Sequence, residues 1–587
     1  LASTNIIITT EAAGILNLLN NRLFYLFVHL VLFLFAILIW RFNRKPNLFL
    51  PLIKAIKKER IKMASLKILD DPQIAILVFF TIILYLFSAY LIIKVPPNNY
   101  DSMTCHMARV GYWLQHGNFW PWPTWNHSQI IYPINSGIQI LWATVFLGND
   151  RLAGFPQWFA SIMGIISIYG ITRVLGWKQN QSIFASFVWA LLPEILLEST
   201  TTQNHLLAST YFITSIYFIF LFYKKGRFEY LVFSSLSLCI SLGTHQLTFI
   251  TLPSLAIVIL ILSMKNKNLN KKVIFHWIGL LLISFILVGS FMYFVNLFNY
   301  GNPFINKNDI VQSDFFKLKF NSFKGFMGNF FSNAFKYLYT SFDLTGLPGG
   351  MSESLYEIRT KITKVLLNDH VNLIETNGFM LDWKPKFIHE DTAWFGIIGF
   401  FILTPLFIYC TIKSFIRKDL FQIGIFIIVG FYFIIWAGFL FWSKFQGRYF
   451  IVIASLMAPS FACLINEKQK IFKTLSYFVV IISIILAINI MINSHSKPLK
   501  GENSIWGKSR NFLQTINAPV YLNFFNVIDH EVPQDARIGL ALNFGNYEYP
   551  FFGKYLKRYL VTIYPNSLIE DSNWINSQNF DWIVNCS

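Results

Sequence analysis

Uninterrupted apolar stretches constrain the fold of this chain more than any other feature of its sequence. Residues 74–93 include no charged side chain, and about 20 predominantly apolar residues let a helix cross roughly 30 Å of hydrocarbon. Stretches of this kind recur near 23–40, 74–94, 153–174, 182–198, 206–223, 229–245, 247–264, 274–296, 394–413, 419–441, 449–466 and 473–492. The sequence therefore predicts an all-α polytopic membrane protein with about 12 transmembrane helices.

The composition agrees with this prediction and excludes several classes of protein. Hydrophobic residues make up 55% of the 587 residues and charged residues only 13%, about half the charged share of a soluble domain. A formal charge of +19 would suggest a nucleic-acid partner for a soluble protein, but here Lys and Arg gather in the loops between spans. The five cysteines form no C-x-x-C pair, so neither a zinc ribbon nor a disulfide scaffold is expected.

The positive residues also predict which side each loop faces, because cytoplasmic loops carry an excess of Lys and Arg. Alternate loops are basic, at 41–67, 173–178, 224–227, 265–272, 413–418 and 468–473. The alternation holds only if the apolar stretch 134–147 does not cross the membrane. Its 14 residues are short for a span, so we predict a re-entrant or surface helix there.

Three long polar segments then lie on the outward side, at 95–152, 297–393 and 493–587. We expect residues 1–72 to form an extra, retained N-terminal helix and a basic cytoplasmic loop, and residues 73–492 to form the transmembrane domain. The last segment alternates apolar runs with helix-like stretches and ends in an apolar run at the chain terminus. This pattern predicts a small C-terminal α/β domain outside the membrane, at 493–587.

Asp101 is the first candidate functional residue, because it directly follows a predicted span. The chain there reads Asn99-Tyr-Asp101-Ser-Met-Thr-Cys105-His-Met-Ala-Arg109. In a helix that begins near Asp101, a spacing of four would place Asp101, Cys105 and Arg109 along one face. A carboxylate at a membrane exit can serve as a general base, a metal ligand or only a helix cap, and the spacing leaves these roles open.

Further carboxylates lie beside hydrocarbon, where a charge is costly unless it is paired or hydrated. Glu390 and Asp391 precede a span on the same side as Asp101, and they are candidates for function or for capping the next helix. Glu194 lies in an apolar run near the outward end of another span. We expect it to face a polar cavity that continues through Asn204 and His205.

Two cations lie in the short outward turn between residues 442 and 449, namely Lys444 and Arg448. Arg grips phosphate with a bidentate fork and Lys as a point charge, whereas snorkelling to lipid headgroups is the structural alternative. His245 lies at another outward helix break, where it would either join the polar cavity or serve as a structural hydrogen-bonding residue. Because no Walker loop or dinucleotide fingerprint occurs, we expect a substrate that is already activated on the outward side.

In chain order, these motifs resemble polytopic glycosyltransferases of the GT-C fold, specifically the bacterial family 39-like group related to protein O-mannosyltransferases and lipid A aminoarabinose transferases. The resemblance covers most of the chain, and its most specific parts lie at 99–115, 148–154, 193–204, 300–304, 390–396 and 447–449. It implies sugar transfer from a polyprenyl-phosphate-linked donor to a lipid, glycan or protein acceptor. It also implies a multi-pass protein of the bacterial inner membrane whose active site faces the periplasm or the exterior.

The resemblance further implies roles for individual residues in an S_N2-like displacement at the anomeric carbon. Asp101 matches an essential Asp of the family, so it would activate the acceptor or contact a divalent metal ion. Glu390 or Asp391 would be a further ligand of that metal. Arg109 would brace Asp101 or meet the donor phosphate.

The chain departs from the family pattern at two positions. Family members usually have an Asp where this chain has His205, and many have a Lys near the position of His245. The second departure strengthens Arg448 as a donor-phosphate residue, with Lys444 beside it, because the family has an Arg-Tyr pair there.

Two other functions remain open from the sequence. A transporter or flippase of a lipid-linked glycan would also be polytopic, although three long segments on one side and the lack of repeat halves speak against it. A membrane scaffold without catalysis would account for the missing Asp at His205.

Overall fold

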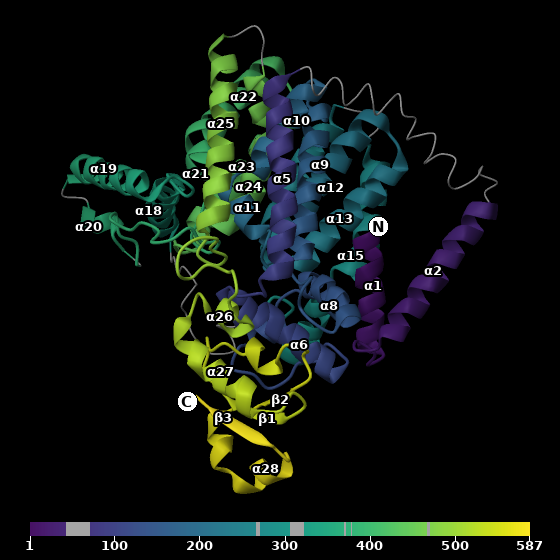
Figure 1. Cartoon of the computed structure of the whole chain (residues 1–587). Coiled ribbons are helices and arrows are strands. Elements are labelled where there is room, and N and C mark those ends of the chain that lie inside the picture. The colour runs from purple at the N-terminus through teal and green to yellow at the C-terminus, as the bar shows by residue number, and fades with distance from the viewer. Residues whose placement is uncertain are drawn as a thin grey trace.

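The computed structural model describes residues 1–42, 71–265, 270–305, 322–368, 371–376, 378–465 and 470–586. Long helices form a bundle, and short helices and a small sheet cover one end of it (Figure 1). We call this end the polar end. The architecture confirms a polytopic all-α membrane protein with a small C-terminal α/β region. Most of the basic loop predicted at 41–67, and parts of those at 265–272 and 468–473, lie outside the described residues.

Nine helical segments within the described ranges are long and apolar enough to cross a membrane. They are α2 (Arg22–Phe42), α5 (Pro72–Lys94), α12 (His205–Lys225), η2 with α14 (Gln246–Thr251, Leu252–Ser263), α15 (Lys271–Val288), α21 with η5 and α22 (Gly396–Ile398, Gly399–Leu403, Thr404–Arg417), α23 (Leu420–Phe439), η6 with α24 and η7 (Gly447–Phe450, Ile451–Met457, Ala458–Leu464) and α25 (Lys470–Asn493).

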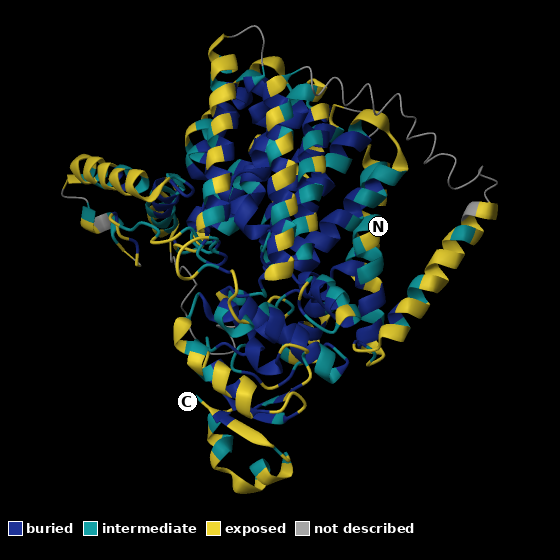
Figure 2. Cartoon of the chain, viewed as in Figure 1, coloured by how far each residue is buried: buried dark blue, intermediate teal, exposed yellow. Residues whose placement is uncertain are grey.

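The other three predicted spans are helical as well. They correspond to α9 (Phe155–Val174), to α10 followed by α11 (Gln179–Ala190, Pro193–Glu198), and to α13 (Phe228–Thr244). Exposed apolar side chains cover the outer faces of the bundle, whereas the helices at its centre are buried (Figure 2). This is the burial pattern expected for a protein whose surroundings are hydrocarbon.

α12 lies at the centre of the bundle, where it packs against α9, α13 and α24. Small hydroxyl residues allow this close packing and satisfy one another across the helices. The Thr214 hydroxyl lies 2.7 Å from that of Ser167, and the Ser215 hydroxyl lies 3.0 Å from that of Ser234. α12 begins at His205, so this rigid helix presents His205 at the polar end of the bundle.

The apolar stretch that we predicted not to cross forms α8 (Asn135–Leu147). At about 1.5 Å per residue, its 13 residues are too short to span the hydrocarbon, and the helix lies at the polar end (Figure 1). An unpredicted helix, α1 (Ala2–Ile15), packs against α8 and α15.

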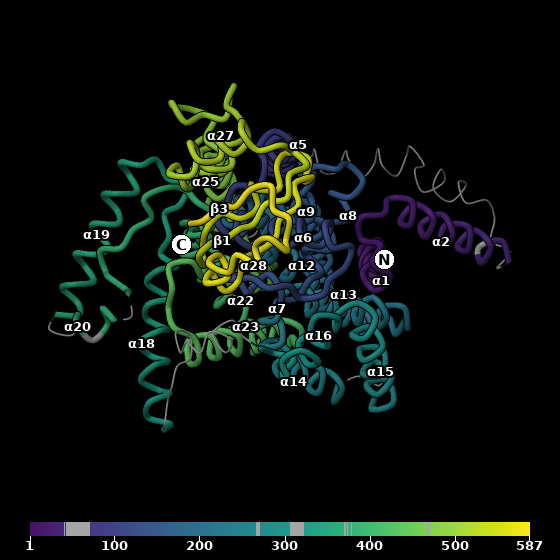
Figure 3. The backbone as a smooth tube through the Cα atoms, turned by 90° about the horizontal axis from the view of Figure 1, so that it is seen from below, coloured from purple at the N-terminus to yellow at the C-terminus, as the bar shows by residue number. Residues whose placement is uncertain are grey.

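The first and third outward segments lie at the polar end, whereas α18, α19 and α20 of the second project from the side of the bundle (Figures 1 and 3). The first segment contains η1 (Ser102–His106), α6 (Met107–His116), α7 (Ser128–Ile131) and α8. The second segment contains the end of α16 (Phe291–Tyr300), followed by α18 (Phe323–Ser341), α19 (Gly349–Leu367) and α20 (Val371–Ile374). α18 and α19 were not predicted. The side-chain amide of Asn98 donates to the carbonyl of Ser496 at 2.7 Å. The backbone N–H of His495 donates to the backbone carbonyl of Ile388 at 2.8 Å. These bonds tie the segments together.

The C-terminal region has the predicted alternation of strands and helices. Three parallel strands pair in the order β2-β1-β3, and the fully buried Ile538 of β1 lies opposite Leu560 on one side and Trp582 on the other. The elements are α26 (Arg510–Thr515), η8 (Pro519–Tyr521), α27 (Leu522–Glu531), β1 (Arg537–Ala541), η9 (Tyr549–Phe552), β2 (Tyr559–Thr562), η10 (Asn566–Glu570), α28 (Ser572–Ser577) and β3 (Trp582–Asn585). The buried Tyr112 hydroxyl donates to Glu548 at 2.6 Å, which fixes this region on α6.

Candidate active site

The site begins at the turn that follows α5, where Asp101 precedes η1. Asp101 does not cap this helix with its side chain. Instead, the side chain of Asn99 accepts the backbone N–H of Ser102 at 2.9 Å. Asn99 rather than Asp101 thus makes this contact at the start of η1, which argues against the capping role that the sequence left open.

The side chain of Asp101 contacts Arg448, which lies between two carboxylates. Its Nη1 atom is 2.7 Å from Asp101 Oδ2 and 2.9 Å from Asp391 Oδ1. We call Asp101, Arg448 and Asp391 the ion triad. The three side chains are 28%, 11% and 15% exposed, respectively, so solvent or a substrate can reach them. Thus the structure brings together three of the predicted site residues from three distant parts of the chain.

A close backbone contact positions Arg448. A Cβ atom on the preceding residue, Gly447, would lie 2.0 Å from the carbonyl oxygen of Ala393, much closer than two atoms can approach. Only glycine therefore allows η6 to lie against the segment that carries Asp391.

Polar neighbours hold Asp391 in place. The amide of Gln203 donates to Asp391 Oδ1 at 2.9 Å, and the backbone N–H of Asp391 donates to His389 Nδ1 at 3.0 Å. Burial raises the pKa of the Asp391 carboxyl, although Arg448 and His389 act in the opposite direction. The Arg448 pair thus helps to keep a partly buried carboxylate ionised.

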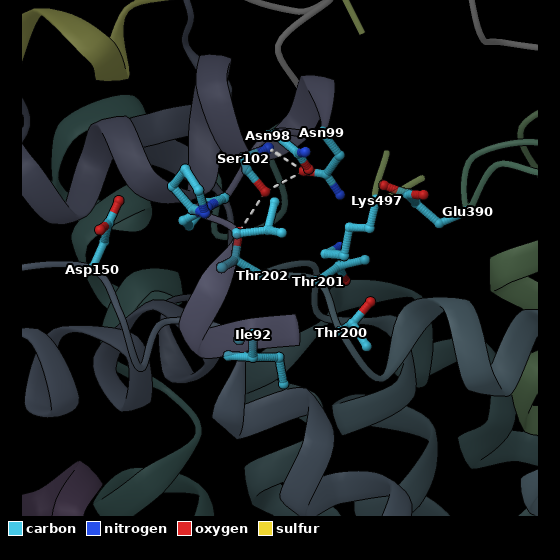
Figure 4. Close-up of a pocket in the computed structure, with 14 residues that line it drawn as sticks. Ile92, Asn98, Asn99, Ser102, Asp150, Thr200, Thr201, Thr202, Glu390 and Lys497 are labelled. Atoms are coloured by element: carbon cyan, nitrogen blue, oxygen red, sulfur yellow. Dashed lines mark hydrogen bonds between the residues drawn. The ribbon is translucent and has the colours of Figure 1, made fainter. Parts of the chain in front are cut away.

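Glu390 lies next to Asp391 in the chain but has different partners. The Ser496 hydroxyl lies 2.9 Å from both of its carboxylate oxygens. Burial opposes ionisation of Glu390, yet His389, Lys497 and these hydrogen bonds hold its pKa below the usual value. Figure 4 shows Glu390 beside the buried Lys497, at a small cavity that Asn98, Asn99, Ser102 and residues 200–202 also line. Lys497 was not predicted from the sequence, since a single Lys after the last span is unremarkable there.

The predicted metal ligands Asp101, Glu390 and Asp391 do not converge on one point. Arg448 occupies the space between Asp101 and Asp391, while Glu390 is bonded to Ser496. Within the described residues, no group of three His, Cys, Asp or Glu side chains is arranged to hold a metal ion. As arranged here, these side chains do not fit a divalent ion, and the guanidinium of Arg448 supplies the positive charge.

Another cavity is bordered by Arg448 and includes two of the predicted cavity residues. His205 and His245 line it with Arg448 and Tyr449, and the ring centroids of His205 and Tyr449 are 4.6 Å apart. The Nε atom of Arg448 has no hydrogen-bond partner among the described residues. This nitrogen is buried, so the guanidinium keeps one unsatisfied donor inside the protein.

Glu194 and Asn204 were predicted to belong to the polar cavity, but neither is among the residues that line it. Glu194 is fully buried, and neither of its carboxylate oxygens has a hydrogen-bond partner within the described ranges. The amide of Asn204 donates to the carbonyl of Thr244 at 3.1 Å.

The other two predicted phosphate-binding cations lie apart from the ion triad. The guanidinium of Arg109 is buried, donates to the carbonyls of Tyr132 and Pro133, and lies over the ring of Trp113. Arg109 does not lie on the helix face that was predicted to carry Asp101, Cys105 and Arg109. The reason is that η1 is a π-helical turn, which adds a residue and breaks the spacing of four. Lys444 is exposed and lies over Phe445. Their roles in phosphate binding stay predictions.

The family resemblance is confirmed for one segment by comparison with known proteins. Residues 133–293, well under half of the chain, match the family model for dolichyl-phosphate-mannose-protein mannosyltransferases. No curated protein matches the sequence.

Several solved structures of membrane proteins are similar to this chain at low identity. The oligosaccharyltransferase of Archaeoglobus fulgidus, in complex with Zn and sulfate, is 11% identical with a TM-score of 0.45, and the match covers 81% of this chain but only 62% of that one. ArnT from Cupriavidus metallidurans, bound to undecaprenyl phosphate, is 9% identical with a TM-score of 0.45 over 87% of this chain and 89% of that one. At this distance the chemistry must be argued from the chain's own residues.

Proposed function

We propose that this chain is a membrane glycosyltransferase of the bacterial cytoplasmic membrane. It would move a sugar from a polyprenyl-phosphate-linked donor to a lipid, glycan or protein acceptor on the extracytoplasmic side. The observation that carries the proposal is the solvent-accessible ion triad of Asp101, Arg448 and Asp391 at the polar end of a membrane bundle. The family match over residues 133–293 supports the reaction class.

Asp101 is the residue that we assign as general base. Its carboxylate would accept the proton of an acceptor hydroxyl while that oxygen attacks the anomeric carbon of the donor. The bond between that carbon and the phosphate oxygen breaks, and the lipid phosphate leaves with the electron pair. Arg448 orients Asp101 through their 2.7 Å contact.

The departing phosphate gains negative charge, and Arg448 is placed to stabilise it. Its Nη1 atom serves the two carboxylates, while its Nε atom has no partner among the described residues. A guanidinium has five N–H donors, so one side can hold Asp101 while the other meets the phosphate. The cavity that Arg448 shares with His205, His245 and Tyr449 would receive the phosphate.

A divalent ion remains a candidate cofactor, and it would have to share or replace the position of Arg448 between two carboxylates. Transfer measured in chelator, with Mg²⁺ or Mn²⁺ added back, tests this. The alternative function, transport of a lipid-linked glycan, needs a passage between both faces of the membrane, whereas the ion triad lies at one end.

The test of the proposal is transfer of label from radiolabelled polyprenyl-phosphate sugars to endogenous membrane acceptors. Asp101→Asn keeps the size of the side chain but removes the base, so we expect the rate to fall by about 10²–10⁴-fold. Asp382→Asn is the matched control, because it removes an exposed carboxylate of an outward segment, and it should leave the rate unchanged. Full activity of correctly folded Asp101→Asn protein at equal abundance would contradict the proposal.

A further inference from the structure

A large cleft with no assigned role opens at the polar end, between the start of α19 and the chain that follows α25. Its volume is about 600 Å³, which is within the usual range for sites that bind small molecules. Lys384, Lys386 and Lys500 line it, and we call it the lysine cleft. It shares no lining residue with the cavity at Arg448 or with the cavity at Lys497.

The charge of the lysine cleft favours an anion. Its three lysines face a single lining carboxylate, that of Glu353. Within the described ranges, none of the three lysines takes part in an ion pair with an acidic side chain. Ammonium groups that share one cleft repel each other, and an anion that carries more than one charge, such as a phosphate, relieves this repulsion.

The neutral lining favours a saccharide next to that anion. Phe387 stacks on His495 with ring centroids 4.2 Å apart and an interplanar angle of 14°, yet Phe387 is 57% exposed. An aromatic ring held in this way offers a flat apolar surface to one face of a sugar. Asn489, Asn493 and Asn503 also line the cleft. Asn489 donates to the Gly346 carbonyl and Asn493 donates to Asn489, and each amide has a second N–H that can donate to a sugar hydroxyl.

The wall of the lysine cleft is continuous with the ion triad. Ile388 and Ser494 pair in a short bridge that lines the cleft, and the chain continues directly from Ile388 to His389 and Asp391. The rings of His389 and His495 are 6.1 Å apart. A ligand in the cleft therefore lies beside the segment that leads to Asp391 of the ion triad.

The lysine cleft also lies beside elements suited to the membrane surface. α25 ends at Asn493, a residue that lines the cleft, so the cleft is level with the end of a membrane helix. α19 lies to one side of the bundle and is oriented crosswise to its long helices (Figure 1). Its exposed apolar side chains recur every three or four residues in its second half, at Ile358, Ile362 and Val365, which is typical of a helix lying in a lipid interface.

We propose that the lysine cleft binds a phosphate-bearing saccharide that belongs to the acceptor. This assignment rests on the proposed function. The lysines hold the phosphate, Phe387 and the asparagine amides hold the sugar, and the adjoining part of the acceptor reaches Asp101. The saccharide comes either from a lipid of the outer leaflet or from a free glycan, and both sources present the same chemistry to the cleft.

The first test is calorimetric titration of the full-length protein in phosphatidylcholine nanodiscs with glucose 1-phosphate, glucose and inorganic phosphate. We expect glucose 1-phosphate to bind at least about tenfold more tightly than either single-feature ligand. The triple variant Lys384→Gln, Lys386→Gln and Lys500→Gln should lose at least about tenfold of that affinity. Phe387→Ala should weaken binding of glucose 1-phosphate and leave that of inorganic phosphate unchanged.

A matched triple variant, Lys361→Gln, Lys364→Gln and Lys554→Gln, removes the same charge outside the cleft and should bind like the wild type. Asp101→Asn should also retain binding, so a failure of the cleft assignment is distinguishable from a failure of the proposed function. The assignment is overturned if glucose 1-phosphate does not bind, if both triple variants bind alike, or if inorganic phosphate binds equally well.

The source of the ligand is tested with nanodiscs that contain either phosphatidylinositol, a lipid with a phosphate and a polyhydroxyl ring, or phosphatidylglycerol. Competition by phosphatidylinositol alone assigns the site to a lipid-borne acceptor, and competition by neither lipid assigns it to a free glycan. Equal competition by both would overturn the assignment, because the cleft would then bind any anionic headgroup.

Discussion

Two Asp–Arg clusters join distant segments at the polar end, and they differ in how completely their polar atoms are satisfied. At the first, Arg510 donates to both oxygens of Asp150, at 3.0 and 2.5 Å, and the Tyr549 hydroxyl adds a third bond at 2.9 Å. The Asp150 side chain is only 2% exposed. At the ion triad, a single nitrogen of Arg448 serves two carboxylates that are 28% and 15% exposed.

This difference separates a structural cluster from a functional one. The buried Asp150 carboxylate is bonded at both oxygens by protein groups, so we assign this pair to holding the C-terminal region against the membrane domain. At the ion triad, two carboxylates that share one guanidinium nitrogen are partly exposed, so they can still meet a ligand, as a site for proton and phosphate transfer requires. The chain therefore uses the same residue types for two purposes.

Arg448→Gln should produce the largest loss of transfer rate. A small loss would contradict the distinction between a functional and a structural cluster. Loss of the charge removes both the partner of Asp101 and the stabilisation of the departing phosphate, so we expect the transfer rate to fall by about 10³-fold. Arg448→Lys should recover part of that loss, because Lys supplies the charge without the planar fork. Initial rates at saturating donor measure both variants.

The control for Arg448 is Arg227→Gln, which removes an Arg whose pair with Glu229 is exposed on both sides. It should leave transfer unchanged. Equal rates in Arg448→Gln and wild-type membranes would assign the ion triad to structure alone.

Arg510→Gln should have the opposite profile, with a loss of stability and little loss of chemistry. Removing it leaves the Asp150 carboxylate buried with only Tyr549 as a partner. Since Arg510 is itself partly exposed, we expect a loss of about 2–3 kcal/mol, below the 3–5 kcal/mol typical of a fully buried pair. Hydrogen exchange should rise in β1 and β2, and the transfer rate of the folded fraction should stay within about threefold of wild type. A selective loss of transfer with unchanged exchange would place Arg510 in the site instead.

The fold was predictable wherever the signal is local. Each span is encoded by about 20 consecutive apolar residues, and each predicted span is helical. α1, α18 and α19 were missed because they are shorter or more polar, and α19 in particular carries charges along its length. Their helical structure depends on packing that hydropathy does not reveal, such as Arg359 lying over the ring of Tyr339.

The members of the site were easier to predict than their contacts. The sequence identifies Asp101, Asp391 and Arg448 as candidates because a charge beside hydrocarbon is costly unless it is paired, hydrated or functional. Their convergence was not predictable, since Asp101 lies far from the other two in the chain, and since Arg448 lies beside Asp391 through a close backbone contact at Gly447. Lys497 has no local signal at all. A single π-helical turn, η1, was enough to turn Arg109 away from the face that regular spacing predicts.

Gln203→Ala should give the smallest of these effects and would sharpen the comparison most. Gln203 has no charge, and its amide donates one hydrogen bond to the same Asp391 oxygen that Arg448 contacts. If the ion triad must be held in one geometry for transfer, losing this bond should lower the rate by about tenfold, the equivalent of about 1.4 kcal/mol. Gln139→Ala, which removes an amide that donates to Asn135 within α8, is the matched control and should have no effect. A tenfold loss in Gln203→Ala with unchanged thermal stability would mean that Asp391 positions Arg448 for catalysis, whereas an unchanged rate would mean that Arg448 and Asp101 act without help from Asp391's neighbours.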